Sequence, residues 1–235
     1  MATAADIETL RSLNSTIVAR ATAALEAFWG TLDLSRPEVA RNALLEFMPV
    51  LTDQYGEAAA VIAADWYDSL RESEGVTGSY VATVAATVPE EVVAERTRFG
   101  AGHLWTENPS QTLLFLVGIA QEYVLQPGRD TITESSMADP AAAGWHRETR
   151  GSRSYPSGCK FCQMLAGRGG VYKESTARFA AHAGCNCVAV PSWDAGAREV
   201  PAALYRASER TSGMTPEQRA RHNERLRDAI DTYVD

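Results

Sequence analysis

The four cysteines of this 235-residue chain all lie between residues 159 and 187, at spacings that could hold a metal ion. Cys159 and Cys162 form a Cys-x-x-Cys pair, and a second group follows in the order His182, Cys185, Cys187. A structural zinc ion takes four sulfur or nitrogen ligands in a tetrahedron, which two such half-sites can supply. We therefore predict a structural Zn2+ site with Cys159, Cys162 and Cys185 as its first three ligands. Either His182 or Cys187 would complete it.

Two other interpretations of the cysteine cluster stay open at this point. The thiols could pack as small apolar groups, or a disulfide could join the two half-sites once the protein meets an oxidant. A tight cluster in a protein made in a reducing cytoplasm favours a metal site over a disulfide framework. No additional acidic ligand or open coordination position is evident in the motif, so the metal would stabilise the fold without supplying chemistry.

The same stretch is a basic segment in an acidic protein. Between Ala141 and Val190 seven basic residues face two acidic ones, a local balance of +5, whereas the whole chain carries −8. The acidic remainder argues against nucleic-acid or anionic-membrane binding by the whole surface. The basic residues predict a local contact with DNA phosphates or with an acidic neighbouring subunit. They are Arg147, Arg150, Arg153, Lys160, Arg168, Lys173 and Arg178.

The elements that must position these residues begin with helices. Apolar residues recur at three- and four-residue steps from Leu10 to Leu32, which predicts one amphipathic helix. Ser35 and Glu38 have the spacing of a capping box for a second helix. Pro49 is expected to end or kink that helix before a third one follows.

Later segments continue this pattern. Thr87–Glu90 and Asn108–Gln111 each carry a helix-start signal. The second starts a largely apolar helix that we expect to end at Pro127–Gly128, with a short helix from Arg129 to Met137 after it. The β-prone segment Ser79–Thr87 predicts either a strand or an extended linker.

The sequence pattern changes in the cysteine-bearing part. We expect one or two helical turns after Cys162, a short strand over Val188–Val190 and a final amphipathic helix capped by Thr215. The predicted fold is therefore mainly α and has three parts. These are a helical N-terminal domain over 1–140, a small α+β cysteine-rich module over 141–193, and a helical tail over 194–235.

Targeting signals are not visible in the sequence. The first ten residues, MATAADIETL, have neither a basic region nor an apolar core, so we expect no secretory signal. The longest apolar run, Leu113–Ala120, is far shorter than the about 18 residues of a membrane span.

The cysteine module resembles the C-terminal module of phage Mu F-like minor head proteins, especially those of phages that infect actinobacteria. The resemblance covers about Trp145 to Pro191 and includes the runs CKFCQMLAGRGGVY and HAGCNCVAVP. Gly184 and Asn186 stand where many of those relatives have histidine. The resemblance implies a protein of few copies at the portal or in the capsid interior, which acts in head morphogenesis and in DNA packaging or delivery.

The predicted function is therefore a structural minor capsid protein in the virion, made in the bacterial host cytoplasm, whose partners are portal, capsid or scaffold proteins. An enzyme is not expected, although some Mu F-like relatives are described as capsid maturation proteases, which makes such a protease the first alternative. No G-x-S-x-G or other nucleophile signature surrounds the available serines and histidines, which are Ser157, Ser175, His103, His146 and His222. A small zinc-stabilised DNA-binding protein is the second alternative, without a helix-turn-helix signature.

Overall fold

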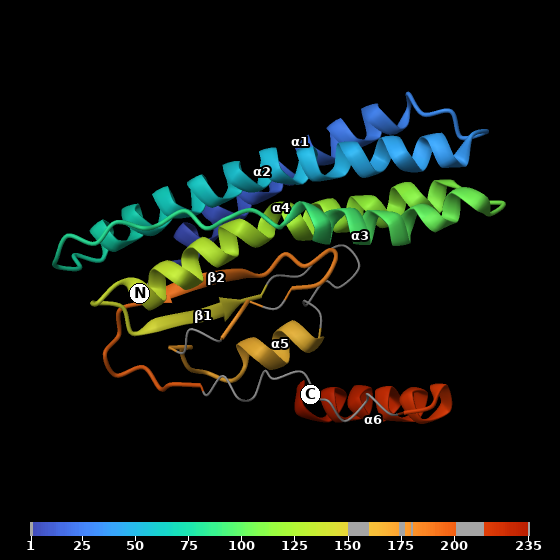
Figure 1. Ribbon diagram of the computed structural model, residues 1–235. Helices are drawn as coiled ribbons and strands as arrows, with labels where there is room; N and C mark the ends of the chain where they lie inside the picture. Colours follow the sequence, from blue (N-terminus) through green and yellow to red (C-terminus); the bar gives the residue numbers. More distant parts are fainter. Residues whose placement is uncertain (1, 150–159, 174–176, 180, 201–213, 235) are drawn as a thin grey trace.

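The protein is mainly helical, as predicted. The computed structural model describes residues 2–149, 160–173, 177–179, 181–200 and 214–234, and within the last range it describes side chains up to residue 225. The long helices α1, α2 and α4 pack against one another in a bundle, a two-stranded sheet packs against α4, and one short helix packs against that sheet (Figure 1). The elements in chain order are α1 (Ala4–Trp29), α2 (Pro37–Ser73), α3 (Glu90–Gly100), the 3-10 helix η1 (Ala101–Trp105), α4 (Ser110–Ala138), β1 (Gly144–Glu148), α5 (Lys160–Ala166), β2 (Val188–Ser192) and α6 (Pro216–Val234).

Local sequence signals fix several helix starts. Thr3 and Asp6 form a reciprocal capping box at the start of α1, and Thr215 and Gln218 do the same for α6. The predicted box at Ser35 is wrong, because Ser35 donates to Asp33 and α2 begins instead with a proline at its first position. Of the predicted apolar stripe, Leu10, Ile17, Ala21 and Leu25 are buried in α1. Leu13 is 39% exposed, Phe28 is partly buried, and Leu32 lies beyond the end of the helix.

Two prolines lie inside helices and end neither of them. The sequence predicts breaks at Pro49 and Pro127, yet α2 and α4 run through these residues without interruption. A proline removes one backbone hydrogen bond and costs about 3 kcal/mol in a helix interior. Both proline residues are buried, so packing between the helices offsets that cost.

The prolines sit near a close crossing of α2 and α4. A Cβ atom at Gly128 would lie 2.9 Å from the carbonyl oxygen of Ala59, and one at Gly56 would lie 3.2 Å from Cγ of Pro127. Glycine is therefore required here for close approach of two backbones. This contact holds the C-terminal part of α4 in place, and this part of the helix faces the cysteine module.

The sheet is small and its strands are far apart in the sequence. β1 pairs with β2 in antiparallel register, with His146 opposite Val190, and all five residues of β2 are buried. β2 and the short helix α5 confirm the predicted strand and helical turns. One core cluster joins residues of α1, α2, α4 and both strands, including Leu10, Tyr67, Ile132, Trp145 and Val190. The cysteine-bearing segment therefore shares its core with the long helices.

A buried carboxylate at the C-terminal end of α4 ties three segments together. One oxygen of Asp139 accepts from Nε of Arg71 at 2.9 Å, from the hydroxyl of Tyr67 at 3.2 Å and from Nε1 of Trp193 at 3.0 Å. Its other oxygen accepts from the N–H of Ala141 at 3.0 Å. α2, the end of α4 and the segment after β2 are thus joined through one side chain.

The segment between α2 and α3 is an extended linker. It lies along the long helices, where the N–H of Ala82 donates to Asp68 and the N–H of Ala85 donates to Thr131. Side chains replace the strand partner that the β-prone sequence Ser79–Thr87 would need.

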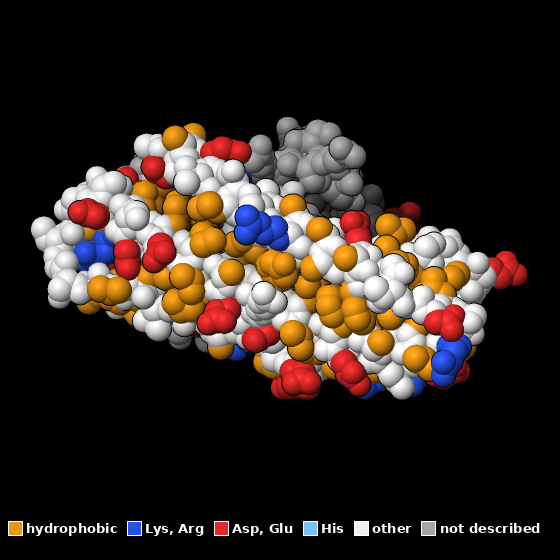
Figure 2. Space-filling view, turned by 90° about the horizontal axis from the view of Figure 1, so that it is seen from above, with side chains coloured by type: hydrophobic (Ala, Val, Ile, Leu, Met, Phe, Trp, Pro, Cys, Tyr) orange, Lys and Arg blue, Asp and Glu red, His pale blue; other side chains and the backbone are white. Residues whose placement is uncertain are grey.

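The outer surface of the helical layer carries apolar and acidic groups together. Val39, Val50 and Val61 of α2 are 47%, 66% and 43% exposed, and Figure 2 looks down on this layer and shows apolar side chains interspersed with acidic ones. Among the helices in the described part of the chain, none combines the length and apolar character that a bilayer crossing requires.

Gly128→Ala should destabilise the protein although alanine is the better helix former. The new methyl group would meet the Ala59 carbonyl, so we expect the free energy of unfolding to fall by about 2 kcal/mol in denaturant titrations. Gly102→Ala is the matched control, because a Cβ there meets no atom within 4 Å. Equal stability of Gly128→Ala and wild type would contradict the close crossing.

Asp139→Asn should remove a pH-dependent part of the stability. Burial raises the pKa of Asp139, but hydrogen bonds from Arg71, Trp193 and Ala141 bring it below its usual value. A depressed folded pKa stabilises the fold above the unfolded pKa of about 3.9, and this stabilisation is lost as pH falls through the folded pKa. We expect the variant to be about 3 kcal/mol less stable at neutral pH, because it leaves the buried Arg71 uncompensated. Urea denaturation should show this gap narrowing below pH about 4, and a gap that does not depend on pH would refute the assignment.

Candidate metal centre

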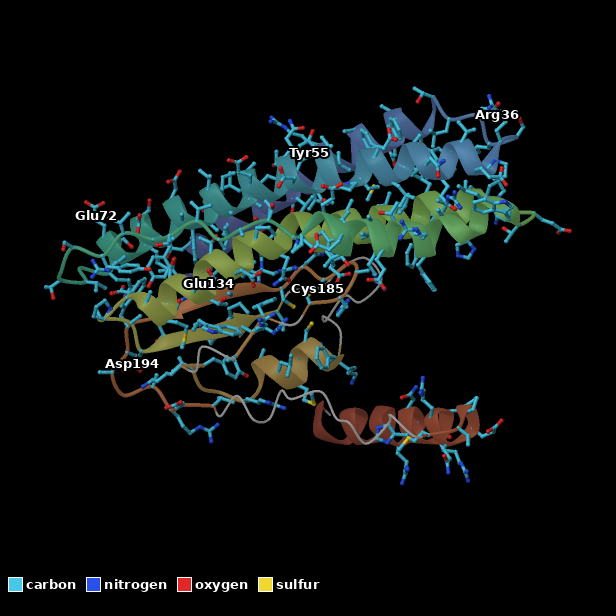
Figure 3. All side chains as sticks on the ribbon, viewed as in Figure 1. Arg36, Tyr55, Glu72, Glu134, Cys185 and Asp194 are labelled. Carbon is cyan, nitrogen blue, oxygen red and sulfur yellow. The ribbon has the colours of Figure 1, made fainter. Side chains whose placement is uncertain are left out.

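Three side chains that are good zinc ligands converge at the joint between α4, α5 and the start of β2. Cys162 Sγ lies 3.8 Å from Cys185 Sγ and 3.7 Å from His182 Nε2. The three ligand atoms all lie within 4.8 Å of one another. Figure 3 labels Cys185, which lies between α4 and α5. Cys162 thus lies next to His182 and Cys185, which follow it in the sequence by 20 and 23 positions.

A short helix and a tight turn supply these ligands. Cys162 is on α5 and is buried. His182 and Cys185 are at the two ends of a turn closed by a hydrogen bond from the Cys185 N–H to the His182 carbonyl at 3.0 Å. Gly184 has a φ of +78° in this turn, a conformation that glycine adopts without strain. This conformation accounts for a glycine at position 184.

The imidazole of His182 is oriented for a ligand role. Its Nδ1 lies 2.9 Å from the carbonyl oxygen of Ala183, so a proton on Nδ1 donates to that carbonyl. The lone pair of Nε2 then faces Cys162 and Cys185. Metal-binding histidines commonly use one nitrogen for such a hydrogen bond and the other for the ion.

The distances between these atoms fit a tetrahedral metal site. Zinc bonds to sulfur and nitrogen, at about 2.3 and 2.0 Å, place two tetrahedral sulfurs about 3.8 Å apart and a sulfur and a nitrogen about 3.6 Å apart. The observed 3.8 and 3.7 Å agree with both values. A disulfide needs about 2.05 Å between sulfurs, and Cys162, Cys185 and Cys187 are free thiols in this structure. The cluster could therefore bind a metal ion.

Two buried guanidinium groups lie beside the cluster. Arg129 of α4 donates from Nη2 to the Cys185 carbonyl at 2.6 Å and from Nε to the Cys187 carbonyl at 3.2 Å. Arg147 of β1 places Nη1 3.9 Å from Cys162 Sγ. The ring of Phe179 lies near both groups, with guanidinium carbons 5.3 Å and 3.7 Å from its centre.

This environment favours a thiolate. Hydrogen bonds from Cys162 and Cys187 hold the pKa of Cys185 far below the usual thiol range, and the positive charge of Arg129 acts in the same direction against burial. Metals bind the thiolate form. These contacts therefore favour the form of Cys185 that a metal binds.

The predicted ligands have different outcomes. Cys162, Cys185 and His182 come together, and Cys187 is buried in hydrogen-bonding contact with Cys162 and Cys185. Cys159 lies outside the described residues. The fourth ligand therefore stays a prediction.

The prediction that Arg147 contacts DNA or a partner needs correction. Arg147 is 4% exposed, because its guanidinium stacks on Phe179 beside the thiols instead of facing solvent. Lys160, Lys173 and Arg178 are exposed, and Arg168 is partly exposed. Arg150 and Arg153 lie outside the described residues.

Sequence reasoning missed Arg129 and Phe179. The expected helix break at Pro127–Gly128 places Arg129 in a separate short helix, whereas it is buried in the continuous helix α4. The available signal was a single arginine in a run that also contains Val124, Leu125, Ile132 and other apolar residues. A lone charge on a buried helix face needs a specific partner.

Comparison with known proteins gives one match. A family model described as VG15 protein matches residues 1–211, which include the long helices, both strands and the candidate metal centre. Searches of curated proteins and of solved structures returned no match.

Purified reduced protein should bind one transition-metal ion per chain at this cluster. With Co2+ as the probe we expect thiolate-to-cobalt absorption, which Cys185→Ser and His182→Ala lose or weaken strongly because each removes a ligand. His103→Ala is the matched control, since His103 is an exposed histidine on η1. Unchanged cobalt spectra in Cys185→Ser would rule out this centre.

Proposed function

This chain belongs to the VG15 protein family, and from that premise we propose that it is a structural minor capsid protein of a tailed phage. The family is one of viral gene proteins, which indicates that the chain is phage-encoded. The proposed place is the portal or the capsid interior, and the proposed role is in head morphogenesis and in DNA packaging or delivery. The observation that carries the proposal is the Cys/His cluster, which lies in the segment that resembles Mu F-like minor head proteins.

We propose zinc as the metal of this centre. Cys162, His182 and Cys185 would be three of its ligands, and Cys159 or Cys187 would be the fourth. Thiolate and imidazole ligands suit zinc, which has no redox chemistry and tolerates the tetrahedral spacing found here. The bound ion supplies a cross-link between α5 and the turn before β2, and its binding energy adds to folding.

The protein's own residues support a role in assembly. Among the described residues between the strands, α5 is the one helix, and the hydrogen bonds of Arg129 together with the shared core hold this part of the chain on α4. Asp139 fixes the segment after β2 on α2. A rigid body of this kind can present the same surface to every subunit it contacts, without ordering costs at each assembly step.

The exposed basic residues are the proposed contact with packaged DNA or with an acidic partner. Lys160, Lys173 and Arg178 are exposed at the surface. Contacts with phosphate by such groups do not depend on base sequence and weaken as salt rises. They suit a protein that meets DNA of any sequence inside a head.

The test uses the phage that encodes this chain. We expect mass spectrometry to find the protein at few copies in purified virions, and an amber allele of its gene to give heads that form but package or deliver DNA poorly. Plasmid-borne wild-type protein and the His103→Ala control should restore infectivity, whereas Cys185→Ser should not, because it removes a proposed ligand. Absence of the protein from proheads and virions would refute the proposal. Loss of major capsid protein cleavage in the amber heads would instead support the maturation protease.

A further inference from the structure

We infer that Arg129 is a positioning residue of the metal centre, which couples metal binding to the docking of the cysteine-bearing turn on α4. The inference rests on the proposed metal centre. It concerns a residue outside the cysteine motif and on a different element, so it assigns part of the site to the long helices.

The contacts of Arg129 support this role first. Its guanidinium donates to the carbonyls of Cys185 and Cys187, which are two residues apart on the same segment. The planar guanidinium presents several N–H groups in a fixed fork, so it fixes both the position and the direction of that backbone. The Cys185 side chain, whose Sγ faces Cys162, is thereby held from the side of α4.

Burial makes this contact costly to break. Arg129 is 3% exposed, and its Nη1 is buried without a hydrogen-bond partner among the described residues. A buried cation is tolerated only when opposite charge lies close to it. The cysteine-bearing turn, whose two carbonyls accept from Nη2 and Nε, is therefore costly for this guanidinium to lose.

The charges of the two arginines also indicate the kind of ligand set. Arg147 approaches the cluster from β1, on the Cys162 side, while Arg129 approaches from α4. A divalent ion with three thiolates carries one net negative charge, and with four it carries two. Two buried guanidinium groups match an anionic, thiolate-rich centre better than a neutral one with two thiolates.

Coupling follows from this arrangement. A bound metal would hold the turn to which Arg129 donates its hydrogen bonds, and Arg129 holds the turn in the position in which Cys185 meets Cys162. Each interaction lowers the ordering cost of the other, and such coupling is reciprocal. Loss of the metal should therefore loosen α4 near Arg129 as well as the turn.

The experiment compares zinc affinities measured by competition with a chromophoric chelator. Arg129→Met keeps the apolar stem but removes the charge and both hydrogen bonds, and Arg129→Lys keeps the charge without the fork. We expect zinc affinity to fall by about 10- to 100-fold in Arg129→Met and by less in Arg129→Lys. Arg41→Met is the matched control, because Arg41 also lies over an aromatic ring, that of Trp105, but on α2. Its zinc affinity should equal that of wild type.

A second measurement uses the wild-type chain and remains decisive if Arg129→Met fails to fold. Hydrogen–deuterium exchange with and without a zinc chelator should show faster exchange in residues 123–138 of α4 together with residues 182–192. Faster exchange in the turn alone, or a zinc affinity of folded Arg129→Met within twofold of wild type, would overturn this inference and leave the metal centre intact. Reduced wild-type protein that binds no zinc would overturn both.

Discussion

Two positive charges are buried in the joint between the long helices and the cysteine-bearing segment, and the arrangement around them follows from the need to compensate them. Arg129 enters from α4 and Arg147 from β1, and the thiol cluster lies next to both. The phenyl ring of Phe179 fills the space beside the guanidinium groups. Without an anionic partner at this place, neither group could stay out of water at an acceptable cost. The cysteine cluster is therefore part of the core as well as a candidate binding site.

A second polar contact secures the opposite end of the same joint. Asp139 links α2 to the segment after β2, and the apolar cluster around Tyr67 and Trp145 lies in the same joint. The cysteine-bearing segment is thus held on the long helices by two different charged centres and one shared apolar core.

Much of the architecture could be predicted from local sequence. The apolar stripe of α1, the capping pair at Thr215, the short strand at Val188 and the clustering of Cys162, His182 and Cys185 all depend on spacing within short segments. The features that could not be predicted depend on tertiary contacts. Pro49 and Pro127 signal a break, and only the packing of α2 on α4 keeps these helices continuous.

Arg147 illustrates the same limit for the candidate site. In the sequence Arg147 belongs to a run of arginines that predicts a solvent-facing group. Its contact with the ring of Phe179, 32 residues later, cannot be inferred from the neighbouring residues. Arg129 was missed because its partners are backbone carbonyls, which carry no residue identity. A hydrogen bond to a main-chain carbonyl requires no particular side chain at the accepting residue, so the sequence gives no sign of it.

The separation of β1 from β2 has a consequence for how such chains can diversify. The pairing of β1 with β2 closes a loop over residues 149–187, and the entropy lost in closing such a loop grows only slowly with its length. Homologues could accept insertions between the half-sites at small thermodynamic expense, provided that the ladder and the thiol positions persist. The surface formed by this loop could therefore change while the helical scaffold stays the same.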